Sequence, residues 1–477
     1  MTHSHIGRRK MQLLACAAAI VGATLLLAAR AGGQTPDRSR VPVAPPAAPF
    51  KFPKSTTQTL PNGLRVIVVE EHALPLVTVR AVVGVDSLYD PAGKEGLFAL
   101  TSAMLLDGTQ SMSADQLSSA FASLGNSVTP FKFTTISQNV DRSMALMADM
   151  LQHPAFPQVD LDRRKAALAA TKQRFAELPA TAPSEVFLTQ LLGAQSATTR
   201  AYSPSQAAVS SLTRDDVQHF YDTYFHPSNT TVIVVGDVTP SAALAEVRKN
   251  FGGWAGGHAP AAAAPPPFVE HPTTIYLVDQ PGAKQTQIVV GTVGPRLDSP
   301  DVAALDVMSY VLGTGTASRI NQNLRERHSY MYSGRPLGIT WRRIPALSII
   351  SGSVPVNPTK SDSALIEWIG ELRGMRDHLP TPAEMSVARG LLIDILPGQV
   401  ETVDLIANQL TQLVQRGLPL NYYDGYAARV ARVTPEEVSA VAAKYLDPAH
   451  LLIVVGGDRK VLEPEMKALG LGPVVVP

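Results

Sequence analysis

Two stretches of the chain share one order of hydrophobic and polar positions. Each opens with a Thr that precedes an amphipathic helical pattern, continues through a Tyr and a Pro, and ends in a run of β-branched residues. These stretches are residues 212–237 and 433–458, and their matching positions are 221 residues apart. A capped helix, a break and a buried strand kept in one register indicate that the chain contains a duplicated unit.

Further elements are predicted between these stretches, where apolar positions alternate or recur with helical spacing. The expected strands cover residues 64–69, 76–85 and 131–140. The expected helices cover residues 96–106 and begin after Ser113, Ser299 and Thr381, which are capping residues. We therefore predict an α+β fold of two tandem duplicated domains, each with a mainly antiparallel sheet packed with helices.

Two segments rich in Pro, Ala and Gly interrupt these patterns. Proline removes a backbone donor and disfavours the helical conformation of the residue before it, so such segments are typical of leaders and linkers. The predicted organisation is a signal peptide at 1–31, a leader at 32–50, an N-terminal domain at 51–255, a linker at 256–272 and a C-terminal domain at 273–477.

The N-terminus has the features of an export signal. Arg8, Arg9 and Lys10 precede an uncharged apolar run at residues 11–29, and small residues follow at a cleavage site ending in Ala31. A retained membrane anchor is the alternative, because the run is long for a signal peptide. We expect an exported, periplasmic protein.

Composition and charge limit the kinds of partner and metal site that the chain can have. Hydrophobic residues make up 45% of the 477 residues, which is typical of a globular protein. The formal charge of +1 gives no electrostatic reason to expect nucleic acid or an anionic membrane as a partner. The single cysteine, Cys16, lies in the expected signal, so the mature chain has no disulfide or cysteine ligand. None of the 11 histidines lies four residues from another, so no helix offers two imidazoles to one zinc ion.

The segment VGVDSLYDPAGKEGLFALTSAMLLDGT (residues 83–109), which follows an LPNG turn, resembles the M16 or insulinase-like zinc peptidases. In that family a helix carries His-x-x-Glu-His and ends in Met-x-x-x-Gly-Thr. Met104, Gly108 and Thr109 match the ending. The resemblance runs from about Thr59 to the C-terminus and implies the mitochondrial-processing-peptidase-like metallohydrolase fold in each half.

The same register implies that the zinc site of the family is degenerate here. The two histidine positions fall on Ala99 and Ala103, and the glutamate position falls on Ser102. The third ligand is implied on a later helix, where Ala169 and Ala170 stand. Alanine has no lone pair for a metal, so we expect no metal in this chain and zinc in a partner subunit. A metal site elsewhere in the chain is the alternative.

A second family signal lies in the C-terminal half. The segments LGTGTASRI (residues 312–320) and LRERHSYMYS (residues 324–333) are similar to the family's LGGGMSSRL and LREKRGLAYS. The resemblance implies that Arg325 and Tyr332 project into the cleavage chamber and donate hydrogen bonds to a peptide carbonyl or its oxyanion. Tyr330 is the rival for this role. Without the family, such a pair would be a shared helix face or a core tyrosine.

Neighbouring residues are expected to contact substrate. Gly313, Thr314 and Gly315 are similar to a glycine-rich loop that lies beside bound peptide in the family, although Thr314 and Thr316 replace two of its usual glycine or methionine positions. His328 lies between the two proposed donors. A phosphate loop is not favoured, because the pattern follows a helix and Ser318 replaces its third glycine.

Together these features predict a non-catalytic subunit, inactive alone, that binds peptide and supplies Arg325 and Tyr332 to a zinc-bearing homologue in a heterodimer. The peptide is expected to add as a strand to a sheet edge. The alternative is a structural or peptide-binding scaffold that has no catalytic partner.

Overall fold

The computed structural model describes residues 50–202, 204–260, 268 and 270–477. The predicted signal peptide (1–31) lies outside the described residues, as does the predicted leader (32–50) except Phe50. Residues 261–267 and 269 of the predicted linker lie outside them too. Within the described ranges, no helix is both long enough and apolar enough to cross a membrane.

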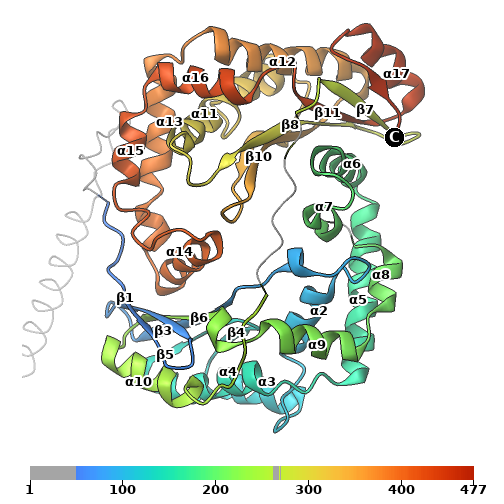
Figure 1. Cartoon of the computed structure of the whole chain (residues 1–477). Coiled ribbons are helices and arrows are strands. Elements are labelled where there is room, and N and C mark those ends of the chain that lie inside the picture. Colours follow the sequence, from blue (N-terminus) through green and yellow to red (C-terminus); the bar gives the residue numbers. More distant parts are fainter. Residues whose placement is uncertain (1–49, 203, 261–267, 269) are drawn as a thin grey trace, which may run out of the picture. The chain divides into compact units, whose positions relative to one another are not determined.

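The described residues form two six-stranded sheets, one in each half of the sequence, and five strands of each sheet follow the same order (Figure 1). The first has the order β1-β2-β6-β3-β5-β4 and the second β12-β7-β11-β8-β10-β9. The first sheet contains β1 (Thr56–Thr59), β2 (Arg65–Glu70), β3 (Leu76–Val83), β4 (Ser127–Thr129), β5 (Lys132–Ile136) and β6 (Thr230–Gly236). The second contains β7 (Thr274–Asp279), β8 (Thr286–Arg296), β9 (Arg335–Thr340), β10 (Leu347–Val356), β11 (Leu452–Gly457) and β12 (Val474–Val475).

The repeat predicted from the sequence is visible in the strand pairing. β6 lies between β2, to which it is parallel, and β3, to which it is antiparallel. β11 lies in the same way between β7 and β8. The predicted α+β architecture is confirmed, and most strand pairs in the two mixed sheets are antiparallel, as predicted.

Helices pack on both sheets, and several begin where the sequence predicts. Capping boxes at Ser113, Thr213, Thr381 and Thr434 start α3, α9, α13 and α16. The N-terminal half contains α2 (Leu97–Met104), α3 (Ala114–Ser123), α4 (Val140–Gln152), α5 (Gln158–Ala176), α6 (Thr181–Leu192), α7 (Ala197–Tyr202), α8 (Gln206–Ser211), α9 (Arg214–Tyr224) and α10 (Pro240–Phe251). The C-terminal half contains α11 (Val302–Leu312), α12 (Ser361–Asp377), α13 (Pro382–Asp394), α14 (Val403–Arg416), α15 (Tyr426–Arg432), α16 (Pro435–Tyr445) and α17 (Arg459–Ala468).

One predicted strand is too long. The expected strand at residues 131–140 ends at Ile136, a 3₁₀ turn covers Ser137–Asn139, and α4 begins at Val140. Val140 and Met144 are both buried and lie four residues apart, so they belong to the helical pattern of α4 rather than to the alternation of β5.

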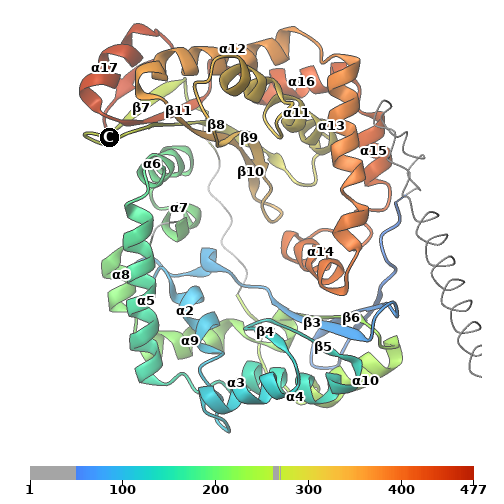
Figure 2. The same ribbon diagram turned by 180° about the vertical axis from the view of Figure 1, so that it is seen from behind.

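Each sheet is covered on one face by a helix from the opposite half (Figure 2). α14 packs on β3 and β6, and α6 packs on β8 and β11. The residues buried under α14 include Ile67, Val69, Val82, Ile233 and Val235, which meet Ile406, Ala407 and Leu410. The residues at α6 are Phe187 and Leu191, which meet Val289, Val293, Ile349 and Val454.

An ion pair fixes the end of α2 to α5. The Asp107 side chain is 4% exposed, and its carboxylate accepts hydrogen bonds from Arg163 at 2.9 Å and from Arg164 at 2.7 Å. Because this carboxylate is buried, its removal leaves the Arg164 guanidinium without its acceptor in a partly buried place.

We expect Asp107→Ala to lower the free energy of unfolding by about 3 kcal/mol, the range for breaking a buried ion pair. Asp160→Ala is the matched control, because Asp160 accepts from the same Arg163 at the surface, and it should cost less than about 1 kcal/mol. Urea unfolding followed by circular dichroism measures both. Equal losses for the two variants would contradict the role given to Asp107.

A second buried carboxylate lies in the C-terminal half. Asp306 of α11 accepts hydrogen bonds from the Tyr426 hydroxyl at 2.8 Å and from the Trp341 indole N–H at 3.1 Å. Burial raises the pKa of Asp306 to about 6, although these two bonds lower it. The folded state therefore binds this proton more tightly than the unfolded chain does, and stability falls as pH rises from about 4 to about 6.

Asp306→Asn should remove this part of the pH dependence, which amounts to at most about 3 kcal/mol for a pKa shift of this size. The measurement is the free energy of unfolding from pH 4 to pH 7.5 for the wild type and the variant. Asp394→Asn, at an exposed position, should keep the wild-type slope. Asp90, whose pKa is also raised to about 6, keeps its own part of the slope in both proteins. A slope between pH 4 and 6 that is as steep in Asp306→Asn as in the wild type would contradict this assignment.

Candidate functional site

The helix at which the family carries its metal motif, α2, is held at its N-terminus by buried and paired charges. The Asp90 carboxylate accepts from the backbone N–H groups of Gly96 and Phe98, both at 2.8 Å. Burial raises the pKa of Asp90 to about 6 despite these bonds. Lys94 pairs with Asp216 at 2.7 Å, so α2 is also tied to α9.

The positions that the resemblance assigns to the metal carry no ligands. Ala99 is exposed and Ala103 is half-buried on α2, and Ser102 is buried with an Oγ that has no hydrogen-bond partner. α5 packs against α2, and its Ala169 and Ala170 are half-buried and exposed. Methyl groups and one hydroxyl do not fit zinc, which prefers imidazole, thiolate and carboxylate.

Elsewhere in the described part of the chain, no three His, Cys, Asp or Glu side chains are grouped so that they could hold a metal ion. The expectation that zinc belongs to a partner subunit stays a prediction, and no chemical step is assigned to a metal in this chain.

Arg325 is presented by a wide helical turn. The segment Asn321–Arg327 is a π-helix, a form that recurs at functional sites. Its inner face is anchored by Leu324, which is fully buried, and by Asn323, whose side-chain amide donates to Glu367 and Glu371 of α12 at 2.9 and 2.6 Å. The inner face is thus fixed to α12, and the adjacent Arg325 side chain is 36% exposed.

Tyr332 approaches Arg325 through a loop. The helix ends at His328, and Ser329 adopts a positive φ of 53°, which turns the chain back. The Tyr330 N–H then donates to the carbonyl of Leu324 at 2.8 Å. As a result the Arg325 guanidinium carbon lies 5.3 Å from the centre of the Tyr332 ring, a cation–π distance.

Two interpretations of this pair are corrected by the structure. Tyr332 lies beyond the helix end, so the pair does not share a helix face, because the positive φ at Ser329 reverses the chain first. Tyr332 is 82% exposed, so it is not a core tyrosine either. The rival Tyr330 packs against the core of the C-terminal half and stacks on His328, with ring centres 4.9 Å apart.

The loop at Gly313, Thr314 and Gly315 is fixed against the sheet and the π-helix. Gly313 ends α11, and a Cβ there would lie 2.4 Å from the Leu337 side chain. Gly315 has a φ of +89°, which favours glycine. The Asn321 side-chain amide donates to the Gly315 carbonyl at 2.9 Å, so the loop and the helix that carries Arg325 are one rigid feature.

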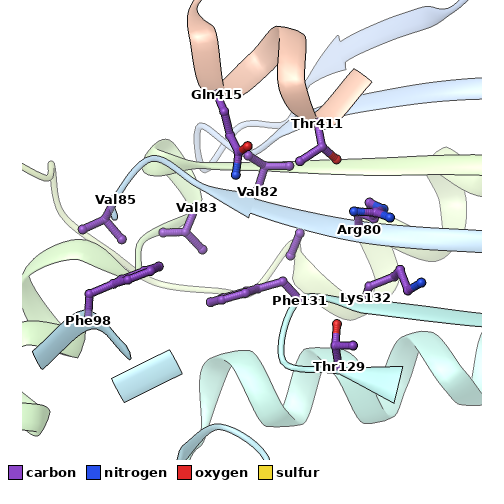
Figure 3. Close-up of a pocket in the computed structure, with 11 residues that line it drawn as sticks. Arg80, Val82, Val83, Val85, Phe98, Thr129, Phe131, Lys132, Thr411 and Gln415 are labelled. Atoms are coloured by element: carbon purple, nitrogen blue, oxygen red, sulfur yellow. The ribbon is translucent and has the colours of Figure 1, made fainter. Parts of the chain in front are cut away.

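Sequence reasoning missed a cavity of about 370 Å³ beside β3 (Figure 3). β3 residues, the turn between β4 and β5, and Phe98 of α2 line it, and Thr411 and Gln415 of α14 close it. Pro130, which lies in the turn before β5, is a sequence signal for where β5 begins. The contribution of α14 has no local signal in the sequence, because α14 belongs to the opposite half.

Charges at one end of this cavity are linked across the two halves. Asp404 of α14 accepts from Arg80 at 3.2 Å and from Lys132 at 3.1 Å. Burial raises the pKa of Asp404, but the bonds from Lys132 and Arg80 outweigh it and the pKa lies below its usual range. Two cations therefore share one ionised carboxylate.

The candidate residues fall into two places. Arg325, Tyr332, His328 and the glycine loop lie together, whereas Ala99, Ser102 and Ala103 lie on α2. Among the described residues, no hydrogen bond, ion pair or ring contact joins the π-helix and its following loop to α2.

Comparison with known proteins gives matches in both halves. The family model described as Insulinase (Peptidase family M16) matches residues 65–194, and the one described as Peptidase M16 inactive domain matches residues 211–392. An uncharacterized zinc protease of Streptomyces coelicolor is 23% identical over 411 residues, which cover 83% of this chain and 88% of the relative. The zinc protease PqqE of Helicobacter pylori is 24% identical over 301 residues, which cover 58% of this chain and 65% of the relative.

Solved structures share the fold. A peptidase M16 inactive domain from Pseudomonas fluorescens is similar with a TM-score of 0.77 at 22% identity, covering 85% of this chain and 98% of that one. The first half of the periplasmic protease PqqL from Escherichia coli is similar with a TM-score of 0.69 at 16% identity, covering 88% and 97%. The two family models, the repeated sheet and the matching neighbours agree, and the chain belongs to the M16 peptidase family.

Proposed function

We propose that this chain is the peptide-binding, non-catalytic subunit of a two-chain M16 peptidase. The observation that carries the proposal is the exposed pair of Arg325 and Tyr332 on a rigid support. In the described residues the Tyr332 hydroxyl has no hydrogen-bond partner, and the only ion pair of Arg325 is a 3.4 Å contact with the exposed Glu326. Their donors are therefore free for an external acceptor.

The chemistry of the pair suits a peptide carbonyl. A guanidinium and a phenol are both donors, and both would strengthen their bonds as the carbonyl oxygen becomes an oxyanion during attack by water. Each such donor is worth about 10²–10³ in rate when it is held in place beforehand. This chain would supply these donors, and a zinc-bearing homologue would supply the metal and the general base.

The partner follows from the donor set of this chain. Because Ala99, Ser102 and Ala103 cannot hold zinc, hydrolysis requires the metal from another subunit. A heterodimer with a zinc-bearing M16 chain satisfies this requirement. The predicted export signal and the periplasmic neighbour PqqL support a periplasmic location for the complex.

A scaffold without catalytic partner is the second candidate, and one observation favours it. α2 keeps the buried Asp90, the Lys94–Asp216 pair and the Asp107–Arg164 pair although it presents methyl groups at the ligand positions. Such contacts hold α2 in place and take no part in binding a metal. Reconstitution with the zinc-bearing homologue separates the two candidates.

In the reconstituted complex, we expect Arg325→Ala combined with Tyr332→Phe to lower kcat/KM by about 10²-fold or more, because two oxyanion donors are lost. The measurement is cleavage of a fluorogenic peptide, with complex formation followed by size-exclusion chromatography. Glu326→Gln and Tyr330→Phe are matched controls on the same helix and loop and should leave the rate nearly unchanged. An unchanged rate for the double variant in an intact complex would favour the scaffold.

A further inference from the structure

The side of β3 that faces β5 is unpaired at its C-terminal end. β5 pairs with β3 from Leu76 to Arg80, and the last bond runs from the Ala81 N–H to the Phe131 carbonyl at 2.9 Å. On the opposite side, β6 stays paired as far as Val83, and the Gly84 N–H donates to Asn229. Because neighbouring residues of a strand point their backbone groups to opposite sides, the N–H and C=O of Val83 face the space beyond β5.

The duplicated half provides an internal comparison. Val82 pairs with Thr231 of β6, and Gly291 pairs with Leu452 of β11, 221 residues after Thr231. Gly291 also pairs with Ser351 of β10, and the pairing of β8 with β10 continues to Arg296. Val82 has no such partner in β5. The same sheet position is thus filled by a strand in the C-terminal half and left unfilled in the N-terminal half.

The 370 Å³ cavity occupies this unfilled position (Figure 3). Val82 points toward α14 and Val83 points toward the opposite core, yet both line the cavity, so the cavity lies off the edge of the strand. Phe98 and Phe131 lie on one side of it, and Thr411 and Gln415 lie on the other. The cavity thus lies where an added strand would pair with β3, between the two rings on one side and α14 on the other.

We propose that this space, the β3 slot, binds the C-terminal residues of an extended peptide, which pairs with β3 as an added strand. This inference rests on the proposed peptide-binding function and specifies where and in which form the peptide binds. An extended backbone meets the N–H and C=O of Val83 with the spacing of a β-ladder. The slot admits about three residues along β3 before β5 begins.

Charge fixes the orientation of the peptide. A peptide antiparallel to β3 has the direction of β5, so its C-terminal end lies next to the beginning of β5 at Lys132. There Arg80 and Lys132 share the single carboxylate of Asp404, and the buried Nε of Arg80 has no acceptor. A terminal carboxylate supplies the missing charge and acceptor.

The two walls of the slot predict which side chains the peptide carries. Because side chains of a strand alternate, one set faces the rings of Phe98 and Phe131 and the other faces Thr411 and Gln415. The substrate class is therefore a peptide with a free C-terminus and alternating apolar and small polar residues.

The test uses the full chain without any partner and a fluorescein-labelled peptide that ends in Leu-Thr-Leu with a free carboxylate. Fluorescence anisotropy should show saturable binding, and the C-terminally amidated peptide should bind about tenfold more weakly. Thr411→Trp should fill the slot and weaken binding at least about tenfold. Gln412→Trp is the matched control, because Gln412 is the next residue on α14 and lines a different cavity.

Hydrogen exchange gives a second readout that does not depend on a variant. Peptide binding should slow amide exchange in the segment from Val82 to Val85 of the wild-type chain. Absence of saturable binding, or equal binding by the Thr411→Trp and Gln412→Trp chains, would overturn the proposal. Self-association that Thr411→Trp abolishes would also overturn it and would assign the slot to a second copy of the chain.

The failure of this inference is distinguishable from failure of the proposed function. The Arg325→Ala, Tyr332→Phe chain should bind the peptide as the wild type does, because neither residue lines the slot. Loss of cleavage in that variant without any peptide protection at β3 would keep the catalytic role and reject the slot. Protection at β3 with unchanged cleavage would keep the slot and reject the catalytic role.

Discussion

The packing of the two halves depends on the burial of both faces of the central strands β6 and β11. β6 is buried along its whole length, and the β-branched residues of β6 and β11 present apolar side chains to both faces of their sheets. One face of each sheet is covered by helices of its own half, and the other needs a separate cover. α14 and α6 provide these covers reciprocally. Each half therefore depends on the other for the burial of its sheet, and the surfaces between the halves are fixed by the same contacts.

This dependence explains why the β3 slot is built from both halves. The β3 slot has its strand edge and aromatic wall in the N-terminal half and its polar wall on α14. The bonds of Asp404 to Arg80 and Lys132 lie at the margin of the apolar contact between α14 and the first sheet. Burial of apolar residues stabilises the contact between α14 and the first sheet, and the ion pairs at its edge position α14 along the sheet.

The two segments that resemble family motifs, α2 and the π-helix with its following loop, differ in the side chains they present. On α2, alanine and serine stand at the positions that the resemblance assigns to the metal, and Asp90 and the Asp107–Arg164 pair hold the helix in place. At the π-helix the donors remain, and their support consists of a buried leucine, an asparagine bound to two glutamates and a turn at Ser329.

The sequence by itself determined the duplicated α+β fold, the capped helices and the absence of metal ligands on α2, because caps, hydrophobic periods and ligand chemistry are local properties. Resemblance to the family also pointed to Arg325 and Tyr332, but the sequence did not show that their side chains meet, since a positive φ at Ser329 reverses the chain between them. Only the tertiary structure decided which helix covers which sheet and where β5 ends beside β3. Those features depend on contacts between residues that are far apart in the sequence, such as Arg80 and Asp404, which are 324 positions apart. No local pattern of apolar and polar residues encodes such contacts.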